Sequence, residues 1–275
     1  MRGMSDADVS AAAAHPMQPT PPTLVFLPGL ANDAEVWADV RAELRRIAPP
    51  ALVPLLDAAL VVDVHTRCPT LPAMAEALLA ETAERAGPLV LVGHSMGGMV
   101  AQHVVRQAPA RVAALALLAT SARADTPELV KLRTEACALF AAGRADEVLR
   151  ANVPFAFHPE RASDAALVER YFAIVQRAGA AQLIAQNRAV MAREDIRPHL
   201  GAIDTWRCPT LVLCGEADLL TPPEVSREIA EAVRGAEFEL LPGCGHMLTL
   251  EQPAAVARRL AAWLARVLPG VVCAG

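Results

Sequence analysis

The sequence has little lysine, few aromatic side chains and no excess of positive charge. Lys131 is the one lysine, aromatic residues make up 4% of the chain, and the formal net charge is −5. A protein that binds nucleic acid needs a concentration of positive charge to attract the phosphates. The composition therefore argues against a nucleic-acid partner.

The sequence also lacks a long apolar run. No stretch reaches the roughly 18 apolar residues that a membrane-spanning helix requires. The segment Met1–Ser10 is too polar to be the apolar core of a signal peptide. We therefore expect a cytoplasmic protein with no membrane partner.

The six cysteines form no recognisable metal or disulfide pattern. They include no Cys-x-x-Cys pair and no histidine at zinc-ligand spacing, so we expect reduced thiols, no metal site and no cofactor. Cys214 and Cys244 lie just upstream of two candidate catalytic residues, and small apolar packing is the favoured interpretation of both. A redox role for either thiol is left open. The cysteines are Cys68, Cys137, Cys208, Cys214, Cys244 and Cys273.

The segment Gly93–Gly97 (Gly-His-Ser-Met-Gly) carries the strongest functional signal. It follows the apolar run Pro88–Val92 and precedes a helical pattern over Gly98–Ala108. Glycines allow backbone angles and close approaches that a Cβ atom would block. Ser95 is therefore predicted on a tight turn between a strand and a helix, with its hydroxyl exposed as a nucleophile requires.

A serine nucleophile needs a base to take its proton and a carboxylate to orient that base. Further along the chain, Asp218 follows an apolar, strand-like run over residues 210–214, and His246 follows a second strand-like run over 237–241. The predicted order is thus serine, aspartate, histidine, each in a loop after a strand. Glu216 is the alternative acid, and we interpret His94 as a hydrogen-bonding neighbour of the site rather than as the base.

Four motifs, in this order and spacing, resemble the α/β-hydrolase family, and the resemblance extends from Thr23 to Leu268. They are Leu27–Leu30 (Leu-Pro-Gly-Leu), Gly93–Gly98, Gly215–Asp218 and Gly245–His246. Many relatives have His-Gly where this chain has Pro-Gly in the first motif.

The resemblance implies a carboxylesterase-like serine hydrolase with Ser95, Asp218 and His246 as the catalytic residues. The family pattern Gly-x-x-Asp selects Asp218 over Glu216. It also implies that the backbone amides of Leu30 and Met96 form the oxyanion hole, the pair of donors that binds the negatively charged oxygen of a tetrahedral intermediate.

The sequence predicts an α/β-hydrolase fold with a mostly parallel sheet of about six strands. A chain of this length can form one large domain that buries about 75% of its unfolded surface. The predicted strands cover residues 23–27, 51–56, 88–92, 112–118, 209–214 and 237–241. Helices over residues 33–47, 72–86, 96–108, 223–233 and 253–267 should cover both faces, as a parallel sheet demands.

Three regions are predicted: a flexible tail (1–22), a hydrolase core (23–120 and 206–270) and a helical cap, or lid (121–205). Within the cap, helical patterns cover residues 126–141, 164–178 and 181–191, and the resemblance implies that the cap roofs the active site. Five aromatic residues in the cap are interpreted as an apolar pocket wall, the alternative being that they pack the cap helices together. They are Phe140, Phe155, Phe157, Tyr171 and Phe172.

These inferences predict a serine hydrolase that cleaves a carboxylic ester or lactone of a small to medium apolar substrate. The reaction would pass through an acyl-enzyme intermediate. Thioester and C–C bond hydrolysis use the same residues and remain alternatives, as does a hydrolase-fold binding protein with little turnover. The natural substrate and the oligomeric state are not predicted.

Overall fold

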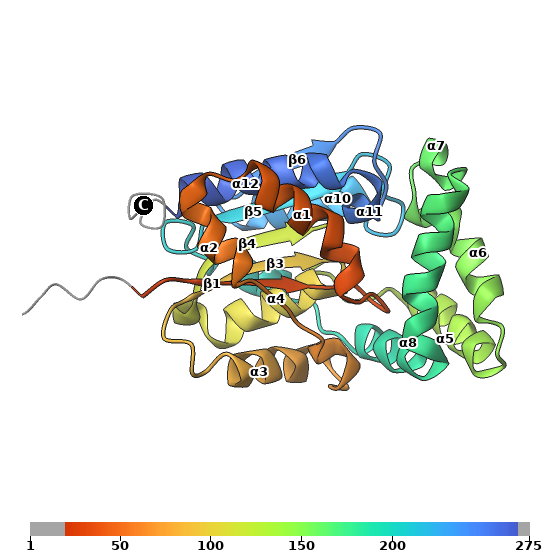
Figure 1. The fold of residues 1–275 in the computed structure, drawn as a ribbon. Coiled ribbons are helices and arrows are strands. Elements are labelled where there is room, and N and C mark those ends of the chain that lie inside the picture. The colour runs from red at the N-terminus through yellow and green to blue at the C-terminus, as the bar shows by residue number, and fades with distance from the viewer. Residues whose placement is uncertain (1–19, 269–275) are drawn as a thin grey trace, which may run out of the picture.

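The computed structural model describes residues 20–268, which contain one six-stranded parallel sheet (Figure 1). Most of the predicted tail (1–19) and Cys273 lie outside the described residues. The strands are paired in the order β2-β1-β3-β4-β5-β6. They are β1 (Thr23–Leu27), β2 (Leu60–Val61), β3 (Leu89–His94), β4 (Val112–Leu118), β5 (Thr210–Gly215) and β6 (Glu237–Leu241).

Alternate residues of the central strands pack into two separate apolar cores. In β1, Leu24 and Phe26 belong to one core, and Val25 and Leu27 to the other. Because neighbouring side chains of a strand point to opposite faces, each face of the sheet must be covered by helices. The predicted α/β class is confirmed.

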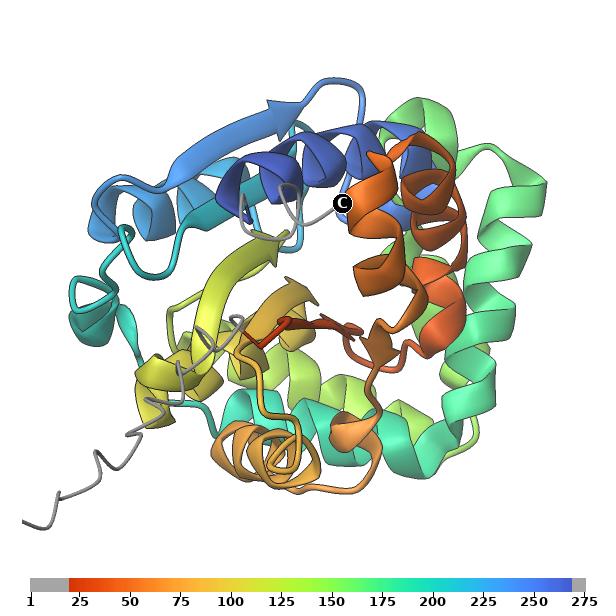
Figure 2. The same cartoon turned by 60° about the vertical axis from the view of Figure 1, so that its left-hand side comes forward.

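Helices lie on both faces of the sheet (Figures 1 and 2). One core includes residues of α1 (Ala38–Ile47), α2 (Val53–Asp57) and α12 (Pro253–Val267). The opposite core includes residues of α3 (Leu71–Glu81), α4 (Met96–Gln107) and α10 (Pro223–Ala232). The short α11 covers Leu248–Glu251, and 3-10 turns η1–η4 cover Ala34–Trp37, Pro50–Leu52, Val64–Thr66 and Pro109–Arg111.

The strand predicted over residues 51–56 is wrong. This segment forms a 3-10 turn and α2, and the strand beside β1 is the two-residue β2 instead. Leu52, Leu55 and Leu56 are all buried, which is the spacing of one helical face and not the alternation of a strand. Pro54 favours this outcome because proline fits the first turn of a helix but cannot donate to a strand ladder.

The helix predicted over residues 72–86 ends earlier, at Glu81. The next residue, Thr82, is 1% exposed, and its hydroxyl donates to the Leu78 carbonyl at 2.8 Å. Its own carbonyl accepts from the Arg111 guanidinium at 3.0 Å. The same carbonyl also accepts from the Arg85 amide at 3.1 Å, which is the bond of a tight turn three residues long and not the next bond of an α-helix.

Residues between β4 and β5 form helices and, within the described residues 121–205, no strand. Figure 1 shows the helices labelled α5, α6, α7 and α8 beyond the carboxyl ends of the strands. The helix α8 contains the two predicted helical patterns, and Gly179 between them has non-helical angles (φ 74°, ψ 165°). The prediction missed α6, α7 and α9. The helices are α5 (Pro127–Ala141), α6 (Ala145–Ala156), α7 (Pro159–Ala162), α8 (Ala165–Met191) and α9 (Arg197–Leu200).

Candidate active site

Ser95 lies at the turn between β3 and α4, at the carboxyl end of a central strand. Its backbone angles (φ 52°, ψ −119°) are in a region that L-residues rarely adopt. The conformation is held by two contacts with the end of β4. The Ser95 amide donates to the Leu118 carbonyl at 2.8 Å, and the Thr120 hydroxyl donates to the Ser95 carbonyl at 2.7 Å. Such strain persists only where neighbouring structure enforces it, and it is typical of functional sites.

The two flanking glycines make this turn sterically feasible. A Cβ atom on Gly93 would lie 2.5 Å from the Gly97 carbonyl oxygen, and one on Gly97 would lie 2.1 Å from the Leu27 carbonyl oxygen. Both distances are far below van der Waals contact. The turn therefore requires glycine at both positions for close backbone approach.

The structure brings Ser95, His246 and Asp218 together in one chain of hydrogen bonds. The His246 Nε2 atom lies 3.0 Å from the Ser95 Oγ atom, and Nδ1 lies 2.9 Å from the Asp218 Oδ2 atom. His246 and Asp218 are buried, with 5% and 1% exposure. With a proton on Nδ1, donated to the carboxylate, Nε2 is free to accept the serine proton.

Asp218 is kept ionised by its surroundings. Burial alone would raise the pKa of this carboxyl group, but the imidazole of His246 and hydrogen bonds from Thr221 hold it below its usual value of 3.8. The Oδ1 atom accepts from the amides of Leu220 and Thr221, both at 2.9 Å, and the Thr221 hydroxyl donates to Oδ2 at 2.8 Å. The alternative acid, Glu216, is exposed, and its carboxylate accepts from the Gly243 amide at 3.4 Å.

His94 lies beside the site without joining its chain of hydrogen bonds. Its Nε2 atom is 3.0 Å from the His246 carbonyl oxygen, so a neutral His94 donates there and fixes the loop. Burial and the neighbouring His246 lower the pKa of His94 to about 3. It therefore remains neutral at physiological pH.

The amides of Leu30 and Met96 lie at the positions that the sequence predicts for oxyanion donors. Leu30 is in the loop after β1, and Met96 begins α4, where amides of the first turn have no helical partner. Within the described residues, neither amide donates to another protein group. Both are available to a bound oxygen.

Glu251 is a residue of this region that the sequence analysis missed. Its buried carboxylate accepts from the Gly245 amide at 3.0 Å and from the His158 amide at 2.8 Å. Burial raises the pKa of Glu251, while these two hydrogen bonds oppose the rise. The carboxylate thus ties the loop that carries His246 to the segment between α6 and α7. No signal in the sequence separates it from a surface glutamate.

We expect Glu251→Gln to lower the free energy of unfolding by about 1 to 3 kcal/mol, because only one of its two terminal atoms can accept. The amide oxygen can take the place of Oε2, which accepts from both the His158 and the Gly245 amides, and the NH₂ group then takes the place of Oε1, 3.0 Å from the Gly245 nitrogen. The NH₂ group would then face an N–H. Urea unfolding at neutral pH measures the difference. The matched control is Glu216→Gln on a neighbouring exposed loop, and equal stability of the two variants would contradict the role of Glu251.

The five aromatic residues predicted as a pocket wall lie in two different environments. Phe155 is 50% exposed, and the other four are buried. The Phe157 and Tyr171 rings meet edge to face with centroids 5.3 Å apart, and the Tyr171 and Phe172 centroids are 6.0 Å apart. The first contact packs the end of α6 against α8, and the second lies within α8. A role in holding substrate stays a prediction.

Cys214 and Cys244 are fully buried, with no measurable exposure. Burial raises the pKa of the Cys214 thiol to about 12, and it raises that of Cys244 as well. A thiol that does not ionise at neutral pH is a poor target for oxidants. The structure thus favours the packing interpretation of both residues.

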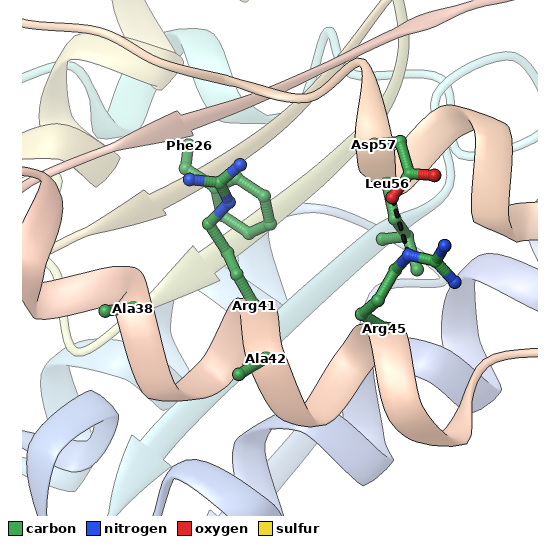
Figure 3. A pocket seen from close by; sticks show the side chains of 7 residues that line it. All are labelled: Phe26, Ala38, Arg41, Ala42, Arg45, Leu56 and Asp57. Atoms are coloured by element: carbon green, nitrogen blue, oxygen red, sulfur yellow. Dashed lines mark ion pairs between the residues drawn. The ribbon is translucent and has the colours of Figure 1, made fainter.

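A surface hollow lies between α1 and α2 (Figure 3), and Ser95, Asp218 and His246 are not among the residues that line it. Its lining includes Phe26, Arg41 and Leu56, and the ion pair of Arg45 with Asp57 (2.6 Å) crosses it. Both partners of that pair are about half exposed, so it contributes little to stability.

Within residues 20–268 there is no cluster of side chains suited to a metal ion, and no helix there could cross a membrane.

The chain is similar to known hydrolases. The family model described as "Alpha/beta hydrolase family" matches residues 24–259. A pimeloyl-[acyl-carrier protein] methyl ester esterase of Aromatoleum aromaticum is 30% identical, over 84% of this chain and 94% of the relative.

Two solved structures have the same fold. An esterase of Thermogutta terrifontis superposes with a TM-score of 0.77 at 25% identity, covering 91% of this chain and 92% of the other. An enol-lactonase of Burkholderia xenovorans superposes with a TM-score of 0.75 at 21% identity, covering 91% and 94%. The second likeness, at this low identity, concerns the fold alone.

Proposed function

Because the chain belongs to the alpha/beta hydrolase family, we propose that it hydrolyses a carboxylic ester or lactone of a small to medium apolar substrate. The observation that carries the proposal is the chain of hydrogen bonds from Ser95 through His246 to Asp218, with distances of 3.0 and 2.9 Å. The related methyl ester esterase supports an ester over other bonds.

The first half of the proposed reaction acylates Ser95. The Nε2 atom of His246 takes the hydroxyl proton as Oγ attacks the substrate carbonyl carbon. Asp218 holds the imidazole in the required tautomer and stabilises the imidazolium that forms. The amides of Leu30 and Met96 donate to the oxyanion, and His246 then returns the proton to the leaving alcohol.

The second half reverses these roles with water. His246 takes a proton from a water molecule, the resulting hydroxide attacks the acyl carbon, and the acid product leaves as Ser95 recovers its proton. In this proposal residues 121–205 act as a cap over the site, and 23–120 with 206–268 act as the core that holds the catalytic loops.

Two measurements test the proposal. A fluorophosphonate probe should label the protein at a ratio of one to one, with the label on Ser95. A panel of p-nitrophenyl esters, lactones, acyl thioesters and a C–C hydrolase substrate should show multiple turnovers, fastest with an ester or a lactone. Labelling without turnover would instead favour a binding protein, and fastest thioester cleavage would favour a thioesterase.

A further inference from the structure

The loop after β1 has a pattern of hydrogen bonds that fixes the direction of its free amide. The Gly29 carbonyl accepts from the Asn32 amide, and the Leu30 carbonyl accepts from the Asn32 side chain, both at 3.1 Å. The peptide bonds of the described residues are all trans. In a trans peptide the N–H points opposite to the C=O, so the Leu30 N–H points away from Asn32.

The next amide of this loop is held by a residue far away in the sequence. The Ala31 N–H donates to the Gln186 Oε1 atom at 2.6 Å, across 155 residues. Ala31 has a φ of 56°, in the left-handed region, where a residue with a Cβ atom is strained. The bond from Gln186 compensates this strain, and it locks the peptide that immediately follows Leu30.

Gln186 is itself held in one orientation. It lies in α8 beyond the break at Gly179, and it is 1% exposed. Its Nε2 atom donates to the Oε1 atom of Gln182 at 3.1 Å. The side-chain nitrogen of Gln182 in turn donates to the Thr66 carbonyl at 2.8 Å. With its nitrogen occupied in this way, Gln186 presents its oxygen to Ala31.

We propose that Gln186 is a positioning residue for the oxyanion hole: it acts from α8, through Ala31, on the amide of Leu30. The inference rests on the proposed function, since Leu30 matters only if a tetrahedral intermediate forms. Loss of the acceptor leaves a buried N–H without a partner, and the Leu30–Ala31 peptide then keeps a single tether, from the Asn32 side chain to the Leu30 carbonyl. Leu30 would donate less well to the transition state, while the substrate would bind as before.

The test compares Gln186→Met with the wild-type protein on p-nitrophenyl butyrate. Removal of a complete oxyanion donor costs about 100- to 1,000-fold in kcat. For the misplaced donor we expect a fall in kcat of about 10- to 100-fold, with KM within about twofold of wild type.

The matched control is Asn187→Met, which removes the adjacent buried amide of α8. The Asn187 side chain donates to the Leu183 carbonyl and accepts from Arg133, and neither partner lies in the loop after β1. Its variant should keep the wild-type kcat. Where Gln186→Met does not fold, Gln186→Asn, one methylene shorter and unable to reach Ala31, should show the same fall in kcat.

Three results would overturn the proposal: an unchanged kcat in the variant that loses the acceptor, an equal loss in Asn187→Met, or a loss expressed only in KM. A failure of the proposed function itself would be seen in the wild-type protein. The wild type would then neither turn over the ester nor take the fluorophosphonate label on Ser95.

Discussion

Ser95→Ala is expected to lower kcat by about 10⁴- to 10⁶-fold and to leave the fold intact. The variant removes the one oxygen that lies 3.0 Å from the base, at His246 Nε2. Alanine adds no atom to the turn, and Ala31 and Ala119 already adopt a similar positive φ elsewhere in the protein. The remaining rate would come from the oxyanion donors and from substrate binding alone.

The measurement is ester turnover, with circular dichroism and thermal unfolding as checks on the fold. Ser163→Ala, a change at an exposed serine in the segment between α7 and α8, is the matched control and should keep full activity. His246→Ala should cost about as much as Ser95→Ala, and the double variant little more, because residues that act as a unit are not additive. Substantial activity in Ser95→Ala would mean that another group is the nucleophile.

Most of the sheet could be predicted because its strands are local patterns. The runs at β1, β3, β4 and β5 are continuous and apolar, which is how strands buried on both faces read. The edge strand β6 has the sequence Glu-Phe-Glu-Leu-Leu, and its first four residues are only partly buried. The segment 51–56 has the same apolar composition as the other four strands, and an apolar run of this length does not separate a strand from a buried helix. Pro54 separates the two possibilities, because it has no N–H to donate to a neighbouring strand but fits the first turn of a helix.

In the candidate site, too, residues within local sequence patterns could be predicted and residues placed by distant contacts could not. Ser95, Asp218 and His246 could be predicted because each follows a strand at a turn of recognisable composition. Glu251 and Gln186 could not, because their roles come from contacts between segments that the chain brings together only on folding. Gln186 reaches a loop 155 residues away, and no local pattern encodes that contact.

Asp218→Asn is expected to lower kcat by about 10⁴-fold while the substrate still binds. The new amide oxygen would take the place of Oδ1, which accepts two backbone amides at 2.9 Å. The NH₂ group would then face His246 Nδ1 and donate to it. That exchange forces the imidazole proton onto Nε2, where it blocks acceptance of the Ser95 proton.

Stability should respond to pH in a direction that follows from the same carboxylate. The pKa of Asp218 lies below its usual value of 3.8 in the folded protein, so its ionised form stabilises the fold. That contribution is present above the usual value and is lost as the pH falls through the folded-state pKa. The difference in unfolding free energy between wild type and Asp218→Asn should therefore shrink when urea unfolding is repeated from about pH 5 down to pH 3.

Glu216→Gln is the control for both measurements on Asp218→Asn, the kcat and the pH dependence of stability. Glu216 is the other acid in the loop after β5 and is exposed. Its carboxylate reaches only the Gly243 amide, at 3.4 Å, and lies outside the chain of hydrogen bonds through His246. The variant should keep turnover and show no comparable loss of stability in acid. A loss of activity in Glu216→Gln with full activity in Asp218→Asn would transfer the role of the orienting acid to Glu216.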